Sequence, residues 1–210
     1  MLDQVQFQHY AGRSTFKGGL QLAVTARGRI RTHPERAVPD EAEAILEAGM
    51  LAHLGFVVDG QPFVIPMGYH YEDGKIYVHS RRGGRLPRHL GRGDPVCVEV
   101  TLLDGLVASR HALYHSMNYR SAIAFGRARS ITHPGEKTAI FERMTLRYFP
   151  GRTSGVDYNP PSAADLKITD LLEIEIEELN GKKRAGPPKG PEDDLEDAFG
   201  TRGIFPIPTT

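Results

Sequence analysis

The chain has 210 residues, which is enough for one good-sized hydrophobic core, whereas two domains would be cramped. Its 26 lysine and arginine residues balance 26 aspartate and glutamate residues, so the charge gives no reason to expect a nucleic-acid or anionic-membrane partner. The N-terminal residues lack the pattern of a signal peptide, and no apolar run is long enough to cross a bilayer. The single cysteine, Cys97, excludes an intrachain disulfide. These features predict a cytoplasmic globular protein without nucleic-acid or membrane partners.

The first elements in chain order are an irregular arm and a helix. Residues 1–35 show no sustained periodicity and are expected to form the arm. Asp40 and Glu43 have the spacing of a capping box, and Gly49 is a suitable residue for a helix end. The pattern therefore predicts a helix that begins after Asp40 and stops at Gly49.

The period then changes to that of short strands. Strands are expected over residues 50–58, 63–71, 75–79, 96–102, 121–131 and 172–177, and helices over 86–90 and 135–149. Asp59-Gly60 and Asp73-Gly74 are two-residue hairpin signals that join the first three strands into a meander. The pattern predicts a mainly β protein, an antiparallel barrel with added helices, over residues 36–180. Residues 181–210 turn Pro/Gly-rich and then acidic, which is typical of an extended or mobile tail.

The densest group of candidate functional residues lies where the third strand ends. His79 and Ser80 are followed by three arginines around a Gly-Gly pair, namely Arg81, Arg82 and Arg85. Glycines let backbone N–H groups approach a phosphate, serine adds a hydroxyl, and arginine supplies a charged bidentate fork. On spacing alone, a solvated basic loop between a strand and a helix is the simpler interpretation.

A second candidate is the polar and aromatic segment from His115 to Ser121, which leads into a strand. The small residues of that strand, Ala122, Ala124, Gly126 and Ala128, either leave room for a flat ligand or allow close sheet packing. His111 and His115 are four residues apart, but no further metal-ligand spacing accompanies them, so no metal site is predicted.

Four segments in a fixed order carry a family resemblance: Gly55–Pro66, Tyr69–His79, Leu103–Val107 and His115–Ser121. They resemble the flavin-nucleotide-binding branch of the pyridoxamine 5′-phosphate oxidase-related superfamily, with the nitroimidazole-reductase proteins as a neighbouring branch. The similarity covers about residues 29–188. It implies a six-stranded antiparallel split barrel that forms a homodimer and binds FMN in clefts between the two subunits.

Carried over by position, the resemblance also implies the residues that bind the cofactor: Val64, Ile65, Pro66, Met67, Gly68, Tyr69, His79, Ser80, Arg81, Arg82, Arg85, Tyr119, Arg120 and Ser121. The backbone of residues 64–69 would lie along the isoalloxazine, and Arg85 would bind the phosphate. His79 and Ser80 would lie beside the ribityl chain and the phosphate. Residues 119–121 would approach the flavin as well, from the second subunit.

The sequence departs from the family pattern at two places. Leu86 stands where many relatives carry a lysine, so Arg81 or Arg82 must supply the missing charge. True pyridoxamine phosphate oxidases hold their substrate with Arg-x-His near the C-terminus, whereas this chain has Lys183-Arg184-Ala185. The second departure argues against the vitamin B6 reaction itself.

The resemblance implies an FMN-dependent oxidoreductase that passes electrons from a reduced nicotinamide donor to a small aromatic or nitro-type acceptor. Arg120 is expected to stabilise the reduced flavin, and His79 to donate a proton or orient the substrate. The alternative is a non-catalytic flavin or haem carrier, in which His79 or His53 would serve as an axial ligand.

Overall fold

The structure is a computed structural model that describes residues 24–207. These residues form two compact units, one comprising residues 24–102 and 120–184, and the other residues 103–119 and 185–207. Strands dominate the larger unit, as predicted. No helix within residues 24–207 combines the length and the apolar character that spanning a bilayer requires.

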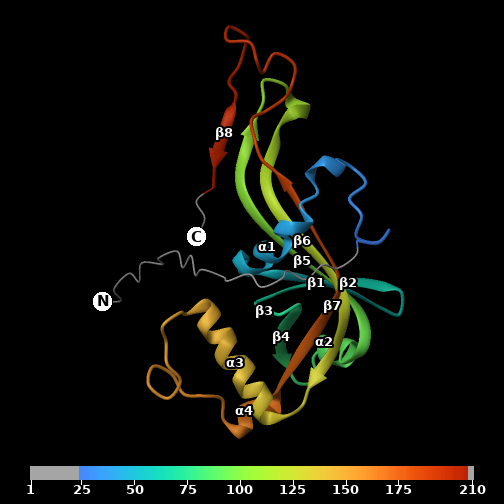
Figure 1. Ribbon diagram of the computed structural model, residues 1–210, viewed down its shortest axis with the longest axis vertical. Coiled ribbons are helices and arrows are strands. Elements are labelled where there is room, and N and C mark those ends of the chain that lie inside the picture. Colours follow the sequence, from blue (N-terminus) through green and yellow to red (C-terminus); the bar gives the residue numbers. More distant parts are fainter. Residues whose placement is uncertain (1–23, 208–210) are drawn as a thin grey trace. The chain divides into compact units, whose positions relative to one another are not determined.

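The strands belong to one antiparallel sheet with the order β2-β1-β5-β6-β7-β4-β3, and β8 pairs with β5 (Figure 1). Their bounds are Ala52–Val58 (β1), Gln61–Met67 (β2), His70–Glu72 (β3), Lys75–Arg81 (β4), Arg92–Ala108 (β5), Ser116–Ile131 (β6), Thr169–Arg184 (β7) and Gly203–Pro206 (β8). Residues 24–207 contain eight strands where six were predicted, because the predicted second strand breaks and the tail adds a short one. No hydrogen-bonded pairing between β2 and β3 closes this sheet.

Both predicted hairpins are confirmed by the backbone. Asp59 and Gly60 have φ values of 50° and 80°, and Asp73 and Gly74 have values of 49° and 76°. Two consecutive residues with positive φ make the type I′ turn that matches the twist of antiparallel strands. The strand between the two hairpins breaks near Gly68, so β2 pairs with β1 and β3 pairs with β4.

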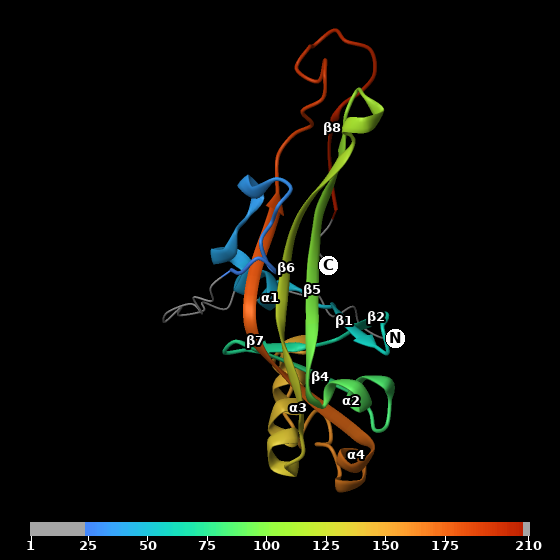
Figure 2. The same cartoon turned by 90° about the vertical axis from the view of Figure 1, so that its right-hand side faces the viewer.

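In the described part of the chain, four α-helices pack around the sheet: Ala42–Ala48 (α1), Arg85–Leu90 (α2), Pro134–Tyr148 (α3) and Ala163–Ile168 (α4). The predicted capping box at Asp40 is wrong, because a 3₁₀ turn over Pro39–Glu41 precedes α1 and its N-cap residue, Glu41, makes no side-chain hydrogen bond. The capping box occurs instead at α4, between Ser162 and Asp165. Figure 2 shows α3 and α4 side by side, in contact with each other.

The main core lies within the larger unit and explains the small residues of β6. Ala122, Ala124 and Ala128 are fully buried among the apolar side chains of β5 and β7. A Cβ atom on Gly126 would come within 2.1 Å of the backbone oxygen of Glu175. Close sheet packing therefore accounts for these small residues, and they do not provide space for a flat ligand.

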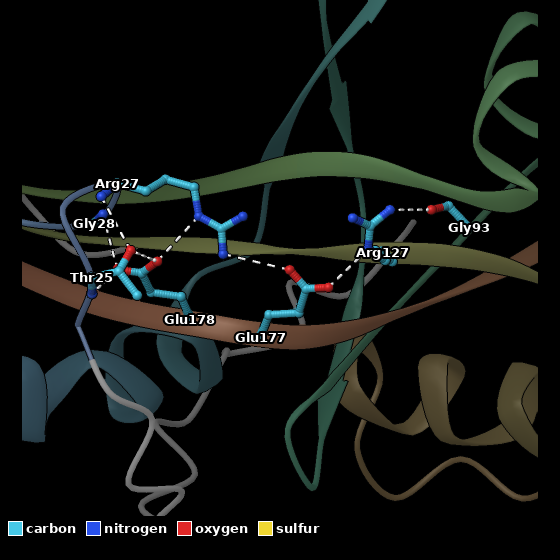
Figure 3. Close-up of polar contacts among 7 residues, drawn as sticks. All are labelled: Thr25, Arg27, Gly28, Gly93, Arg127, Glu177 and Glu178. Carbon is cyan, nitrogen blue, oxygen red and sulfur yellow. Dashed lines mark hydrogen bonds and ion pairs between the residues drawn. The ribbon is translucent and has the colours of Figure 1, made fainter.

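Residues 24–28 of the predicted arm are packed against β7 through Glu178 (Figure 3). The Glu178 side chain is 1% exposed, and it accepts hydrogen bonds from the amide and hydroxyl of Thr25, the Nε of Arg27 and the amide of Gly28, at 2.6–3.1 Å. Burial would raise the pKa of Glu178, but these donors hold it below its ordinary value. The first 23 residues of the predicted arm lie outside the described residues.

The C-terminal segment, which the sequence predicts to be extended or mobile, consists mainly of turns and bends and is packed within the smaller unit. Asp193 is completely buried and accepts hydrogen bonds from the hydroxyl of Ser109, the amide of Arg110 and the amide of Gly190. The Arg110 guanidinium donates to carbonyl oxygens of the same segment, including that of Leu195 at 3.1 Å. The sequence pattern missed this packing because Asp193 stands in an acidic run that is typical of a solvated tail.

Candidate functional site

Two of the three predicted site segments meet where the guanidinium of Arg85 lies over the ring of Phe63. The guanidinium carbon is 4.3 Å from the ring centroid, within the range of a cation–π contact. Arg85 begins α2, and Phe63 precedes Val64 in β2. The basic loop after β4 and the strand expected to face the isoalloxazine therefore lie against each other.

The loop between β4 and α2 is a tight turn that depends on its two glycines. Gly83 has a φ of 72°, a conformation that L side chains rarely adopt. The amide of Gly84 donates to the carbonyl of Arg81 at 3.0 Å, and a Cβ atom on Gly84 would lie 2.9 Å from that oxygen. Gly84 is the N-cap of α2 and offers no side-chain acceptor, so the first amides of the helix remain for another acceptor.

Neighbouring residues at the end of β4 face opposite ways, because successive side chains of a strand alternate. The Ser80 hydroxyl oxygen is 3.7 Å from the Cβ position of Gly84, so Ser80 lies beside the turn. The His79 ring instead lies edge-on to Phe141 of α3, with ring centroids 5.5 Å apart. His79 is exposed by its surface area, yet desolvation by the surrounding protein lowers its pKa below the ordinary value.

The three arginines of the loop do not share one set of contacts. Arg82 donates its amide to the carbonyl of Ile168 at 2.8 Å and its Nη1 to the carbonyl of Lys167 at 3.1 Å, both at the end of α4. Arg85 lies over Phe63, and Arg81 is exposed at the end of β4. The sequence pattern predicts that the arginines converge on one ligand. In the structure, Arg82 and Arg85 instead lie on different sides of the loop.

The predicted flavin strand presents one face to solvent and one to the core. Val64 is 67% exposed and Pro66 is also exposed, whereas Ile65 and Met67 pack against the main core. The residue opposite Val64 on β1 is Gly55, which has no side chain to cover the outer face. The outer face of β2 is thus accessible to a flat ligand over Val64 and Pro66.

The last two predicted residues of this segment belong to its turn. Gly68 is exposed, while Tyr69 is fully buried and its hydroxyl donates to the carbonyl of Leu46 at 2.5 Å. The amide of Tyr69 also donates to the hydroxyl of Tyr148 in α3 at 2.7 Å. Its side chain is therefore part of the core rather than of an open site.

The third predicted segment lies in β6, which β1 and β5 separate from β2 in the strand order. Three strand spacings of about 4.8 Å place the two strands roughly 14 Å apart along the sheet. Arg120 and Ser121 are half-buried, and the Ser121 hydroxyl donates to the carbonyl of Lys182 on β7 at 3.4 Å. Tyr119, in the smaller unit, is half-buried as well. Because of this strand order, Arg120 and Ser121 do not lie beside β2 within one copy of the larger unit.

The structure adds two residues that the sequence analysis did not select, Phe63 and Glu99. Phe63 precedes Val64 in β2. Only the alternation of side chains along a strand indicated that Phe63 faces the opposite side of the sheet from Val64. His53 lies on the outer face of β1, with its Nδ1 3.2 Å from a carboxylate oxygen of Glu99 on β5. These two residues are 46 positions apart, so no local pattern could have paired them. Among residues 24–207, no three potential metal-ligating side chains (His, Cys, Asp or Glu) come together.

Comparison with known proteins places this geometry in a family context. The sequence profile of the family described as pyridoxamine 5′-phosphate oxidase matches residues 39–183. Similar solved structures include the flavocytochrome Anf3 from Azotobacter vinelandii, with 30% sequence identity and a TM-score of 0.79 over 89% of this chain and 86% of that chain. The FAD and heme binding protein from Mycobacterium smegmatis is 28% identical, with a TM-score of 0.74 over 82% of this chain and 84% of that chain.

A more distant structure shares the fold alone. It is a proposed 5-nitroimidazole antibiotic resistance protein from Bacteroides thetaiotaomicron, 22% identical, with a TM-score of 0.57 over 70% of this chain and 85% of that chain. No curated protein sequence matches the chain at a significant level.

Proposed function

The chain belongs to the pyridoxamine 5′-phosphate oxidase family, and from that premise we propose that it is a flavin-binding oxidoreductase. Family membership confirms the resemblance drawn from the sequence, and the antiparallel sheet has the character of the split-barrel fold. The contact of Arg85 with Phe63 carries the functional proposal, because it joins the donor-rich loop to the exposed strand.

The donors at the start of α2 fit the phosphate of a flavin nucleotide. Arg85 supplies a charged fork, Ser80 a hydroxyl, and the first turn of α2 supplies amides that Gly84 leaves uncapped. These groups make one phosphate site, and for this reason we propose FMN as the cofactor. FAD, which the relative from M. smegmatis binds according to its name, would need sites for a second phosphate and for the adenosine.

The free edge of β2 fits the flat ring system of the flavin, because β2 stands at the end of the strand order and, within residues 24–207, pairs with β1 alone. The backbone of residues 64–68 would lie along it, next to the exposed side chains of Val64 and Pro66. When bound, the flavin supplies the electron transfer itself, and the protein supplies binding, orientation and charge. The proposed reaction takes electrons from a reduced nicotinamide donor to a small aromatic or nitro-type acceptor.

We further propose that Tyr119, Arg120 and Ser121 reach the flavin from a second copy of the chain. Val57 and Val64, 64% and 67% exposed, lie on the outer faces of the β1–β2 hairpin, where an apolar surface favours association. Arg120 would then place positive charge beside the ring system. His79 would act on the substrate from the α3 side of β4, donating a proton or orienting the substrate.

Purified protein tests the proposal directly. A flavin spectrum, and release of FMN on denaturation identified by mass spectrometry, are the expected results, with bleaching by NAD(P)H in the absence of oxygen. Release of FAD would correct the cofactor and leave the function intact. A flavin that never bleaches would favour a carrier, and a colourless protein that ignores added FMN and FAD would contradict flavin binding.

Haem binding is a second candidate function, which the names of the two most similar of these relatives support. His53 is the histidine whose surroundings fit a haem ligand, because the Glu99 carboxylate near its Nδ1 would orient the ring and leave Nε2 for the iron. A Soret band that is lost in His53→Ala and kept in His79→Ala is the expected result for this function. A protein that shows no Soret band after incubation with haem would exclude it.

A further inference from the structure

A cavity of about 330 Å³ lies under α3 and α4, at the ends of β6 and β7. Part of its wall is apolar, from Ile131, Pro134 and Leu166, and part is polar, from Ser130 and Thr132. The volume is at the lower end of the range for small-molecule sites, roughly 300–1,000 Å³. The cavity can therefore hold a compact organic molecule.

The charged side chains that line this cavity are mostly cationic. Arg82, Lys137 and Lys167 contribute three positive charges, and Asp170 contributes one negative charge. Asp170 already accepts a hydrogen bond from the amide of Gly83 at 3.3 Å. An excess of two positive charges against a partly apolar wall favours an anionic occupant.

Lys137 is the buried cation among these side chains, whereas Arg82 and Lys167 are exposed. The residue is 6% exposed, and its Nζ donates to the carbonyl of Leu166 at 2.5 Å and to the carbonyl of Thr169. Both acceptors are neutral, and no carboxylate of the described chain forms an ion pair with it. Desolvation lowers the pKa of Lys137, and the charge of Asp170 opposes this shift. Burial of an ammonium group whose hydrogen-bond acceptors are neutral is costly, so a bound anion would relieve this cost.

The cavity and the proposed flavin site use different sides of the loop after β4. Arg82 reaches the cavity and hydrogen-bonds to the end of α4, whereas Arg85 and Ser80 lie on the side of Phe63 and Gly84. We infer that this cavity is a separate binding site for a small organic anion. A phosphate or carboxylate group lies toward Lys137 and Arg82, and a compact apolar body packs against Ile131 and Leu166.

Titration calorimetry with phenyl phosphate and with benzoate tests this site, and benzyl alcohol is the neutral control. We expect one equivalent of at least one of the two anions to bind, and benzyl alcohol not to bind. The anion that binds more tightly identifies the ligand class. If neither anion binds to the wild-type protein, the inference is wrong.

Two variants of the cavity are compared with a lysine on the other unit. We expect Lys137→Met to weaken anion binding at least tenfold by removing the buried charge, and Lys167→Gln to weaken it about threefold. Ala163→Leu should weaken binding by narrowing the cavity without changing its charge, and it keeps the test decisive if Lys137→Met does not fold. Lys189→Gln, at an exposed lysine, should bind as the wild type does. Unchanged binding in both Lys167→Gln and Ala163→Leu would overturn the inference.

The same titration is repeated with the protein saturated with FMN. Retained anion binding is expected, since the cavity is separate from the flavin site. Loss of anion binding on flavin saturation would show that the anion occupies the flavin phosphate site, and it would overturn the inference. If no flavin binds, the first titration still decides the cavity, so the two proposals can fail independently.

Discussion

Arg82 and Arg85 stand three residues apart in one basic loop, yet they belong to different surroundings. Arg85 stacks on Phe63 of β2, beside Ser80 and the N-terminus of α2. Arg82 binds the carbonyl of Lys167 and lines the cavity under α3 and α4. A group of like charges in the sequence is therefore not a group in space, because each turn and strand residue directs its side chain separately.

His79 and Ser80, which are neighbours in the sequence, likewise lie on different sides of β4. Ser80 belongs to the Arg85 side, and His79 lies against Phe141 on the α3 side. A substrate that meets His79 would approach from the side of α3, while the flavin phosphate would be held on the other side. Four substitutions test this division, in decreasing order of the expected effect.

The largest effect is expected for His79→Gln. A general acid contributes about 100-fold or more to the rate, so turnover of a nitroaromatic acceptor should fall by about 100-fold. The pKa of His79 is lowered, so its protonated form builds up only below about pH 6.5, the ordinary value. Wild-type turnover should therefore rise as the pH falls through this lowered value, and His79→Gln should lack that rise. A pH–rate profile shared by both proteins would remove His79 from the reaction.

Arg85→Ala should weaken flavin binding by about 30-fold. A hydrogen bond to a charged group contributes about 2 kcal/mol, which corresponds to that factor in the dissociation constant. Fluorescence titration of the flavin-free protein measures this, with Arg92→Ala, an exposed arginine at the start of β5, as the matched control. Equal affinities for Arg85→Ala and the control would mean that the phosphate is held elsewhere.

Arg82→Ala should weaken anion binding in the cavity more than it weakens flavin binding. Phenyl phosphate binding in the cavity should weaken about tenfold, since one charged hydrogen bond is lost, and flavin binding should weaken only about threefold. Calorimetry and fluorescence titration on the same preparation give both numbers. A larger effect on the flavin than on the anion would join the two arginines into one phosphate site.

The smallest effect is expected for Phe63→Leu, which keeps an apolar side chain but removes the aromatic face under Arg85. A cation–π contact at an exposed site contributes about 0.5–1 kcal/mol, so flavin affinity should fall about threefold. Phe125→Leu is the matched control, because Arg27 lies over that ring in the same way, 4.8 Å from its centroid. The contact of Arg85 with Phe63 has no role in flavin binding if the two variants bind flavin equally well.

Local patterns predicted the elements whose stability depends on their own residues. The Asp-Gly pairs at 59–60 and 73–74 formed the expected turns, because few other residues accept two positive φ values in succession. Alternation of apolar residues in 96–102 and 172–177 placed those strands correctly, although both extend further at each end. The break at Gly68 was not predicted, because its cause is the pairing of β2 and β3 with different strands.

Elements that depend on distant partners were predicted less well. The sequence predicted that the acidic tail is solvated. In the structure, Asp193 accepts hydrogen bonds from Ser109 and Arg110, which precede it by more than 80 positions. The prediction of a capping box at Asp40 was wrong because Pro39 begins a 3₁₀ turn that precedes the helix. The order of the family segments, in contrast, was enough to identify the family, since it extends over most of the chain.

By itself, the sequence determined most of the strands, the two hairpins, the family and the basic loop after β4. Only the tertiary structure decided that Arg85 faces β2, that Arg82 and Lys137 line a cavity, and that His79 lies against α3. The physical reason is that alternation along a strand shows that neighbouring side chains point to opposite faces. It does not show which helix or strand packs on each face, and that depends on residues far away in the sequence.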